Sequence, residues 1–302
     1  MIAFRDAGKT YRSLFGKSVR AGDGVTLDAA AGEVLGIAGP NGAGKSTMIG
    51  LLLGYLAPTT GSVTIDGRAP RAFIEREGIG YLSELVNIPP LWKAREALVR
   101  YALLVGIVQR DLEARVDRVV ALLGLEEHQS KRVKALSKGN LQRLGLAQAL
   151  LRDERVLILD EPTHGLDPVW TQKFREIVDG LRRPDRVILI ASHNLDELQR
   201  VADRVAIVDR GRVQRVVDLR AGTPSGGRVR YRLEVESGAG HVTRHFPAAT
   251  RSGESFDVEA ADLVALNHGI AAALADGAVF RAIAPAHSAL EQQFREAVGA
   301  DR

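Results

Sequence analysis

The chain has 302 residues, of which 45% are hydrophobic and 26% are charged, so its composition is that of a folded globular protein and excludes a disordered one. The formal net charge is +4, a mild excess spread along the chain that suits an anionic ligand or a membrane surface and does not argue for nucleic acid. The absence of cysteine excludes disulfides, thiolate metal sites and a cysteine nucleophile.

No segment of the sequence is predicted to enter a membrane. Residues 1–6 lack the long apolar core of a signal peptide. The most apolar stretch of helix length, Ala97–Val108, contains Arg100 and is too short to span a bilayer. We therefore expect a chain that is soluble by itself and that another protein anchors if it works at a membrane.

The first predicted elements are two short edge strands, Ile2–Phe4 and Val25–Leu27, around a loop that contains Tyr11. A buried strand, Glu33–Ala38, follows. It leads into the phosphate-loop pattern G-x-x-x-x-G-K-[ST], whose residues here are Gly39, Pro40, Asn41, Gly42, Ala43, Gly44, Lys45, Ser46 and Thr47. The apolar residues after the pattern predict a helix, so the pattern has the strand–loop–helix context that it needs.

This loop predicts a nucleotide phosphate site. Its glycines keep side chains away, so that backbone N–H groups can point into an anion site, and the helix behind it adds the positive end of its dipole. Lys45 is placed to reach the β- and γ-phosphates, and the Ser46 hydroxyl to hold Mg²⁺. A glycine-rich turn without a ligand is the alternative, but the complete match in this context favours nucleotide binding.

Beyond the loop, short apolar runs alternate with helical patterns. Strands are predicted at Ser62–Ile65, Ile79–Leu82, Val156–Leu159, Val187–Ile190, Val205–Val208 and Arg212–Val216. Helices are predicted within Trp92–Leu125, Leu141–Leu151, Trp170–Leu181 and Asp196–Val201. This alternation predicts an α/β fold with a parallel sheet. An apolar stripe in the first helical region indicates core packing and consists of Leu112, Val116, Val119, Val120 and Leu123.

A second helix start has features of an anion site. In the segment Leu136–Arg143, Ser137 can cap the helix and the Gly139 backbone can approach an anion closely. Nothing nearby in this chain needs a second phosphate-binding helix start. A second copy of the chain could use it.

Two adjacent carboxylates, Asp160 and Glu161, follow the buried strand Val156–Leu159, where ligand groups gather in α/β sheets. Asp160 suits the shell of Mg²⁺, and Glu161 suits the orientation or deprotonation of an attacking water. A solvated Asp-Glu pair is the alternative. His193 ends the next strand and could bond a γ-phosphate or the water, although a lone histidine there is more often structural.

The composition changes near residue 220. Residues 221–227 have the composition of a linker, and the alternation of Tyr231, Leu233 and Val235 with charged residues predicts a half-exposed strand. Further strands are expected around Phe256–Val258 and Val279–Ile283, and helices over Ala261–Ala275 and around Leu290, Phe294 and Val298. We expect a small α+β domain over 221–302. His241 and His245 bracket a predicted strand segment and lack a third ligand, which argues against a metal there.

The order of these motifs resembles the ATP-binding subunit of ABC transporters over roughly residues 1–217, and the motifs are jointly very specific. The resemblance implies a P-loop NTPase domain over 1–220 with a helical subdomain at about 84–152. The lysine in the signature, Gln142-Arg143 after it and the tail sequence 288–294 together resemble the ABC-2 exporter branch, in which the ATPase pairs with a separately encoded membrane subunit.

The resemblance also implies roles for individual residues. Tyr11 would stack on adenine, Glu161 would be the catalytic base and His193 the switch histidine. The family closes head to tail, so each ATP with its Mg²⁺ would lie between the phosphate loop of one chain and Ser137–Gly139 of the other, and Asp167 would lie in the loop crossing that interface. Ser46, Asp160 and Glu84 would contact Mg²⁺, and Glu84 falls where the family usually has a glutamine that also contacts the membrane subunit.

Three departures from the family pattern bear on function. The signature is Leu-Ser-Lys-Gly-Asn instead of Leu-Ser-Gly-Gly-Gln, with Ser137 and Gly139 kept. The carboxylate of Glu84 can still bind Mg²⁺, but its charge can change the communication with the membrane subunit. The additional domain at 221–302, absent from the shortest family members, could serve dimerisation, regulation or cargo binding.

The sequence thus predicts an ATP-hydrolysing subunit that drives export through an integral membrane permease. It would lie in the cytoplasm, on the inner face of the membrane, and the apolar stretch between Glu84 and Trp92 is the candidate docking surface for the permease. A local hydrophobic contact is the alternative for that stretch. The alternative functions are an importer ATPase and a soluble ABC-type ATPase of translation or DNA repair. The second is disfavoured by the single cassette and by the absence of sustained heptads. The transported substrate is not encoded in this chain.

Overall fold

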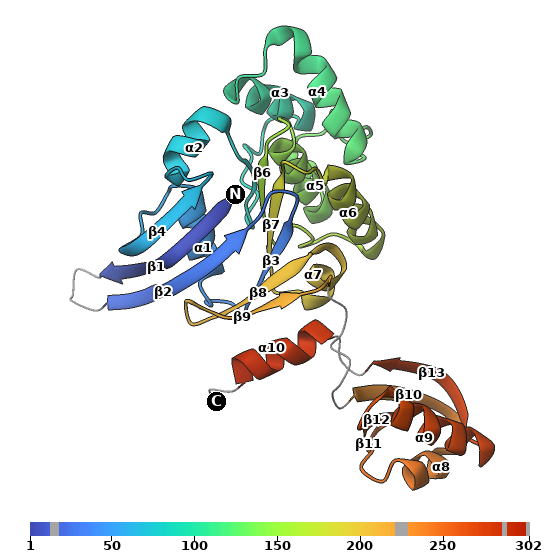
Figure 1. The fold of residues 1–302 in the computed structure, drawn as a ribbon. Helices are drawn as coiled ribbons and strands as arrows, with labels where there is room; N and C mark the ends of the chain where they lie inside the picture. The colour runs from blue at the N-terminus through green and yellow to red at the C-terminus, as the bar shows by residue number, and fades with distance from the viewer. Residues whose placement is uncertain (13–17, 221–228, 286–288, 300–302) are drawn as a thin grey trace. The chain divides into compact units, whose positions relative to one another are not determined.

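The computed structural model describes residues 1–12, 18–220, 229–285 and 289–299 (Figure 1). The chain divides into two compact units, Met1–Arg220 and Ala221–Arg302. The segment 221–227, expected to be a linker, lies outside the described residues.

The first unit is built on a sheet in the order β5-β6-β7-β3-β8-β9. Its strands are β3 (Val34–Ala38), β5 (Gly80–Leu82), β6 (Val156–Asp160), β7 (Val187–Ser192), β8 (Arg204–Asp209) and β9 (Arg212–Asp218). The first five are parallel, and β9 returns antiparallel to β8. Every residue of β3, β6 and β7 is buried, as expected of strands covered on both faces. The expected α/β class is confirmed.

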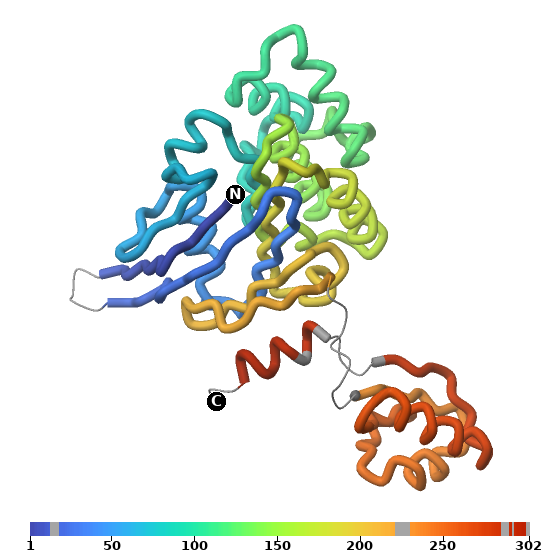
Figure 2. Tube along the Cα trace, in the orientation of Figure 1, coloured from blue at the N-terminus to red at the C-terminus, as the bar shows by residue number. Residues whose placement is uncertain are grey.

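A second sheet, in the order β2-β1-β4, is antiparallel and consists of β1 (Ile2–Arg12), β2 (Ser18–Ala29) and β4 (Thr60–Ile65). The prediction of two short edge strands was wrong, because β1 and β2 form one long ribbon (Figure 2). Tyr11 therefore lies in β1, opposite Val19, and not in a loop. Helix α1 (Lys45–Leu52) lies against this sheet, and its buried side chains join a core that includes residues of both sheets, Phe4 and Ile37 among them.

The remaining helices of the first unit are α2 (Pro70–Glu77), α3 (Ala94–Leu104), α4 (Gln109–Leu122), α5 (Lys138–Ala149), α6 (Pro168–Leu181) and α7 (Leu195–Val201), with a 3₁₀ turn at Val133–Ala135. Helices α3 and α4 pack on each other and extend from the sheet as a separate helical lobe (Figure 1). The expected stripe is buried, from Leu112 at 2% exposure to Leu123 at 1%. No helix in the described ranges is long and apolar enough to cross a membrane.

The second unit has the element order β10-α8-β11-β12-α9-β13, followed by α10. The bounds are β10 (Val229–Ser237), α8 (Ala239–His245), β11 (Thr250–Ser252), β12 (Ser255–Ala260), α9 (Leu263–Ala275), β13 (Val279–Pro285) and α10 (Ala289–Gly299). The antiparallel sheet order β11-β12-β10-β13 makes this the ferredoxin-like arrangement. Leu233 of β10, Phe256 of β12 and Leu266 of α9 belong to one core, so the expected α+β fold is confirmed.

One expectation about this second unit was wrong. The segment that contains His241 and His245 is helix α8 and not a strand. Gly238, with φ 77°, turns the chain out of β10 and into the helix. His245 lies 2.9 Å from Asp276 (Nε2 to Oδ2), and no group of three His, Cys, Asp or Glu side chains suited to a metal occurs in the described part of the chain.

Candidate functional site

The phosphate loop runs from the end of β3 into α1, and its shape depends on two close approaches. A Cβ on Gly39 would lie 2.4 Å from the Val208 carbonyl oxygen. A Cβ on Gly44 would lie 2.7 Å from the Ala21 oxygen, and Gly44 has φ 110°, which L side chains rarely adopt. Only glycine fits both positions. The loop is therefore held against β8 and β2, while Pro40, Asn41 and Gly42 remain exposed to solvent.

The Lys45 side chain lies within the loop. Its Nζ donates to the Gly39 carbonyl oxygen at 2.7 Å and lies 3.4 Å from that of Pro40. It also lies 4.0 Å from Oε1 of Glu161. Since Lys45 is 8% exposed, its ammonium is a nearly buried positive charge directed at the exit of β6. Ser46 beside it is exposed, so its hydroxyl is free to meet a ligand.

Asp160 ends β6 and carries an unfavourable negative charge. Its pKa is raised to about 6 because the carboxyl is buried and because the charges of Glu84 and Glu161 lie near it, with Lys45 opposing them. Glu84 lies near Asp160 because β5 pairs in parallel with β6, with Leu82 opposite Leu159. Crowded carboxylates of this kind are relieved by a bound cation.

The carboxylate of Glu161 is fixed by the end of β7. Its Oε2 accepts from the Ser192 hydroxyl at 3.1 Å, and its Oε1 accepts from the His193 backbone N–H at 3.0 Å. The His193 ring Nδ1 lies 2.9 Å from Oε1, while the side chain is 63% exposed. One buried carboxylate thus has an imidazole that opens to solvent as a direct neighbour, a pairing suited to moving a proton.

The helix start at α5 forms a second group of contacts. Ser137 is the N-cap of α5, and its hydroxyl accepts from the Asn140 N–H at 3.3 Å. The Lys138 Nζ lies 2.8 Å from Nε2 of His164. A Cβ on Gly139 would lie 3.0 Å from the Gly165 oxygen, so α5 begins directly against the loop that leads to α6. Asp167 caps α6 through the Trp170 N–H at 2.8 Å.

The contacts therefore gather the site residues predicted from the sequence into two groups. Lys45, Asp160, Glu161 and His193 interact with one another, whereas Ser137, Gly139 and Asp167 belong to the exposed group at the start of α5 and α6. Tyr11 is 41% exposed and lies in the same ribbon as Ala21, which touches the phosphate loop.

The candidate docking stretch is divided between core and surface. Leu85 is 78% exposed and Leu91 is 63% exposed. Ile88, in contrast, is 5% exposed, and Val86 lies where a Cβ on Gly145 of α5 would meet it at 2.6 Å. Leu85 and Leu91, together with the exposed Pro90, thus remain available to another molecule.

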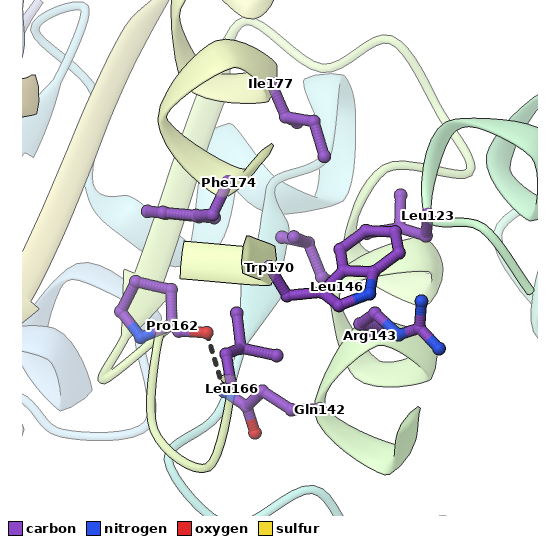
Figure 3. Close-up of a pocket in the computed structure, with 9 residues that line it drawn as sticks. All are labelled: Leu123, Gln142, Arg143, Leu146, Pro162, Leu166, Trp170, Phe174 and Ile177. Carbon is purple, nitrogen blue, oxygen red and sulfur yellow. Dashed lines mark hydrogen bonds between the residues drawn. The ribbon is translucent and has the colours of Figure 1, made fainter. Parts of the chain in front are cut away.

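Sequence reasoning named Gln142 only as part of the signature continuation and gave it no role. In the structure its side-chain amide donates to the backbone carbonyl oxygens of Glu161 and Pro162. Gln142 also lines a small cavity of about 10 Å³ between α5 and α6 (Figure 3). This volume is that of about one water molecule, so the cavity is a packing gap and not a nucleotide site.

Comparisons with known proteins agree with this arrangement. The family described as ABC transporter matches residues 23–164. The ABC transporter ATP-binding protein NatA of Bacillus subtilis is 33% identical, with the match covering 70% of this chain and 87% of NatA. The Nod factor export ATP-binding protein I of Rhizobium etli is 35% identical over 70% of this chain and 66% of its own length. The methionine import ATP-binding protein MetN of Caulobacter vibrioides is also 35% identical, over 70% of this chain and 65% of its own length.

Solved structures of ABC transporter cassettes are also similar to this chain. The dimeric structure of a bacterial ABC transporter cassette is 25% identical, has a TM-score of 0.67 and covers 72% of this chain and 99% of the cassette. A dimeric post-hydrolysis state of an ATP-binding cassette, bound to ADP and phosphate, matches with the same values.

Proposed function

Because the chain belongs to the ATP-binding subunits of ABC transporters, which hydrolyse ATP, we propose that it powers an ABC-2 type exporter through a separate permease. The observation that carries the proposal is the contact set that joins Lys45, Glu161 and His193 at one edge of the sheet. Export is favoured by the similarity to a Nod factor export protein, and the similarity to MetN makes import the competing function.

In the proposed reaction, ATP lies with its phosphates along Gly39–Thr47 and its adenine on Tyr11. Lys45 leaves the loop carbonyls and binds the β- and γ-phosphates. A water oxygen attacks the γ-phosphorus, the bond to the β–γ bridging oxygen breaks, and Glu161 accepts the water proton. His193 contacts the γ-phosphate and Glu161 together, so the imidazole reports whether the γ-phosphate is present.

The residues at the exit of β6 fit a magnesium ion. Ser46, Asp160 and Glu84 would hold it, and their hard oxygens are the donors that Mg²⁺ prefers. The raised pKa of Asp160 supports this assignment, because a carboxyl that resists ionisation beside two other carboxylates gains from a divalent cation. When bound, the ion neutralises charge on the phosphate oxygens.

The second group of residues acts on the ATP of another copy. Ser137 is exposed and Gly139 is half-buried at the start of α5, where backbone N–H groups and the helix dipole favour an anion. We propose that two copies close head to tail, each supplying this helix start and its Asp167 to the other's nucleotide. Leu85 and Leu91 then remain on the surface for the permease, and the assembly lies on the cytoplasmic face of the membrane.

Glu161→Gln tests the chemistry of the proposal. The amide keeps the size of the side chain but cannot accept a proton, so hydrolysis falls by about 100-fold or more while ATP still binds. Phosphate release measures turnover, and gel filtration with ATP and Mg²⁺ detects the dimer. Unchanged turnover would exclude Glu161 as the base.

The proposed role in transport is tested by identifying the membrane protein that binds the chain. Purification of the tagged chain from membranes should recover a multi-span membrane protein, and vesicles holding both proteins should accumulate substrate only with the ATPase outside, which is the geometry of export from a cell. Recovery of an extracytoplasmic binding protein together with the complex would favour import instead.

A further inference from the structure

The backbone of Glu161 has an unusual conformation. Its φ is 48°, in the left-handed region, which few residues other than glycine adopt. Such a backbone persists only where the surroundings fix it, and it is found often at functional sites. The side chain of Glu161 is directed by this conformation, so the groups that hold the main chain also determine where the carboxylate lies.

Three hydrogen bonds hold this main chain. The Glu161 N–H donates to the Ala191 carbonyl oxygen of β7 at 2.8 Å. The Glu161 carbonyl oxygen accepts from the His164 N–H at 3.1 Å, within its own turn. It also accepts from Nε2 of Gln142 at 3.1 Å, and this bond is the one that comes from a helix outside the turn and the sheet.

The side-chain amide of Gln142 is oriented for this contact. Its Nε2 also donates to the carbonyl oxygen of Pro162 at 3.2 Å, a bond that Figure 3 shows. Two acceptors of the main chain require the amide nitrogen, and not the amide oxygen, on this side. Gln142 is 6% exposed, so loss of its amide would leave the buried carbonyl oxygens of Glu161 and Pro162 without this donor.

The position of Gln142 on α5 connects the start of this helix to Glu161. It follows Ser137 by five residues, on the first turns of the helix that begins at Lys138. Because a helix moves as a rigid element, a displacement at its exposed start is carried to the Gln142 amide and from there to the peptide that joins Glu161 to Pro162.

We propose that Gln142 is a positioning residue, which fixes the Glu161 main chain and so couples the start of α5 to the carboxylate that acts on water. The inference rests on the proposed function, in which the start of α5 meets the nucleotide of a second copy. Glu161 then has its productive geometry only while α5 is held in place, so each chain's catalytic carboxylate is set by the nucleotide that its α5 contacts.

Two variants of the full chain test the donor. Gln142→Leu removes it, and Gln142→Glu keeps the shape of the side chain but presents oxygen atoms to both carbonyls. We expect the kcat for ATP hydrolysis to fall about 10- to 100-fold in both, because a misplaced catalytic group loses rate and not affinity. The Kd for ATP, measured by titration with a fluorescent analogue, should stay within about threefold of the unchanged chain. Thermal melts identify a variant that fails to fold. If Gln142→Leu does not fold, Gln142→Glu still tests the proposal.

A double-mutant cycle separates positioning from a general structural role. In the Glu161→Gln background, Gln142→Leu should lower the residual single-turnover rate by less than twofold, because the group that it positions is already inactive. Losses that multiply would overturn the proposal, as would a kcat within threefold of the unchanged chain for both single variants. Gln148→Leu, at the half-buried far end of α5, is the control and should leave hydrolysis unchanged.

The two proposals fail in different ways. If Glu161→Gln leaves turnover unchanged, the assignment of the catalytic base is wrong. If Glu161→Gln abolishes turnover and the Gln142 variants do not reduce it, the positioning role alone is wrong.

Discussion

The two groups of site residues differ in how they are held. Lys45, Asp160 and Glu161 are between 5% and 8% exposed, and Lys45 donates to the Gly39 carbonyl oxygen and lies 4.0 Å from Glu161. Lys138 and Asp167 are exposed and are anchored by a helix start or one side-chain contact. The groups that we propose to act on a bound phosphate are thus fixed before it arrives, whereas the groups that we propose to meet a second copy lie on the surface with few constraints.

The largest expected effect lies in the buried group. Lys45→Ala removes the ammonium that lies 4.0 Å from Glu161 and leaves that carboxylate without its nearest cation. We expect hydrolysis to fall by at least about 100-fold, the usual cost of removing a main donor to a developing charge. Nucleotide titration and phosphate release measure the loss. Wild-type affinity in this variant would mean that the loop backbone alone binds the phosphates.

Asp160→Asn tests how much the buried Asp160 carboxylate costs in the stability of the folded chain. In the unfolded chain the carboxyl ionises near pH 3.8 and in the folded chain near pH 6, so stability is lost as the pH rises through this window. The rise of the pKa from 3.8 to about 6 corresponds to about 3 kcal/mol at pH 8. The neutral amide introduced by Asp160→Asn removes the cost of ionising this buried carboxyl. The Tm of the protein in EDTA without nucleotide should therefore rise by about 5–10 °C at pH 8.

The control for Asp160→Asn is the same melt at a pH below 3.8, where the carboxyl is protonated in both states and the two Tm values should agree. Hydrolysis should nevertheless be lost at every pH, because the variant lacks one of the proposed magnesium ligands. An equal gain in Tm at both pH values would point to packing as the cause.

A smaller effect is expected in the exposed group. Lys138→Ala removes the contact with His164, and exposed contacts of this kind contribute roughly 0–1 kcal/mol. Hydrolysis should fall no more than about fivefold, the rate factor that 1 kcal/mol represents. Lys134→Ala, also exposed and shortly before α5, serves as the control. A 30-fold loss in Lys138→Ala alone would show that the exposed group is as tightly constrained as the buried one.

The smallest effect is expected when residues 221–302 are deleted. Every side chain of both groups lies in Met1–Arg220, and each unit has its own core. The rate of ATP hydrolysis should stay within about twofold, since no site residue is removed. Gel filtration with ATP then separates two roles for the second unit. A tenfold loss of activity together with loss of the dimer would assign it to dimerisation.

The sequence predicted the features that depend on neighbouring residues. The phosphate loop and the Asp160–Glu161 pair are short patterns whose surroundings in the chain already indicate strand and helix. The contact of Gln142 with Glu161 could not be predicted, because it joins residues 19 apart and depends on how α5 packs beside β6. No periodicity in the sequence encodes that packing.

The long ribbon of β1 and β2 was underestimated for a different reason. Its register shifts between Phe4 and Ala7 and again on either side of Lys9, which disrupts the alternation that identifies a strand. Asp6, with φ 47°, lies within the first shift. Helix α8 was missed because its seven residues are too few to show a helical period.

The central position of β3 has a consequence for synthesis on the ribosome. Both of its sheet neighbours come late in the sequence, β7 at Val187–Ser192 and β8 at Arg204–Asp209. The phosphate loop is therefore made early, but the strand before it stays unpaired and apolar until about two thirds of the chain has been translated. A nascent chain cannot gain protection from ATP in that interval, and its exposed strands are the segments that a chaperone would bind.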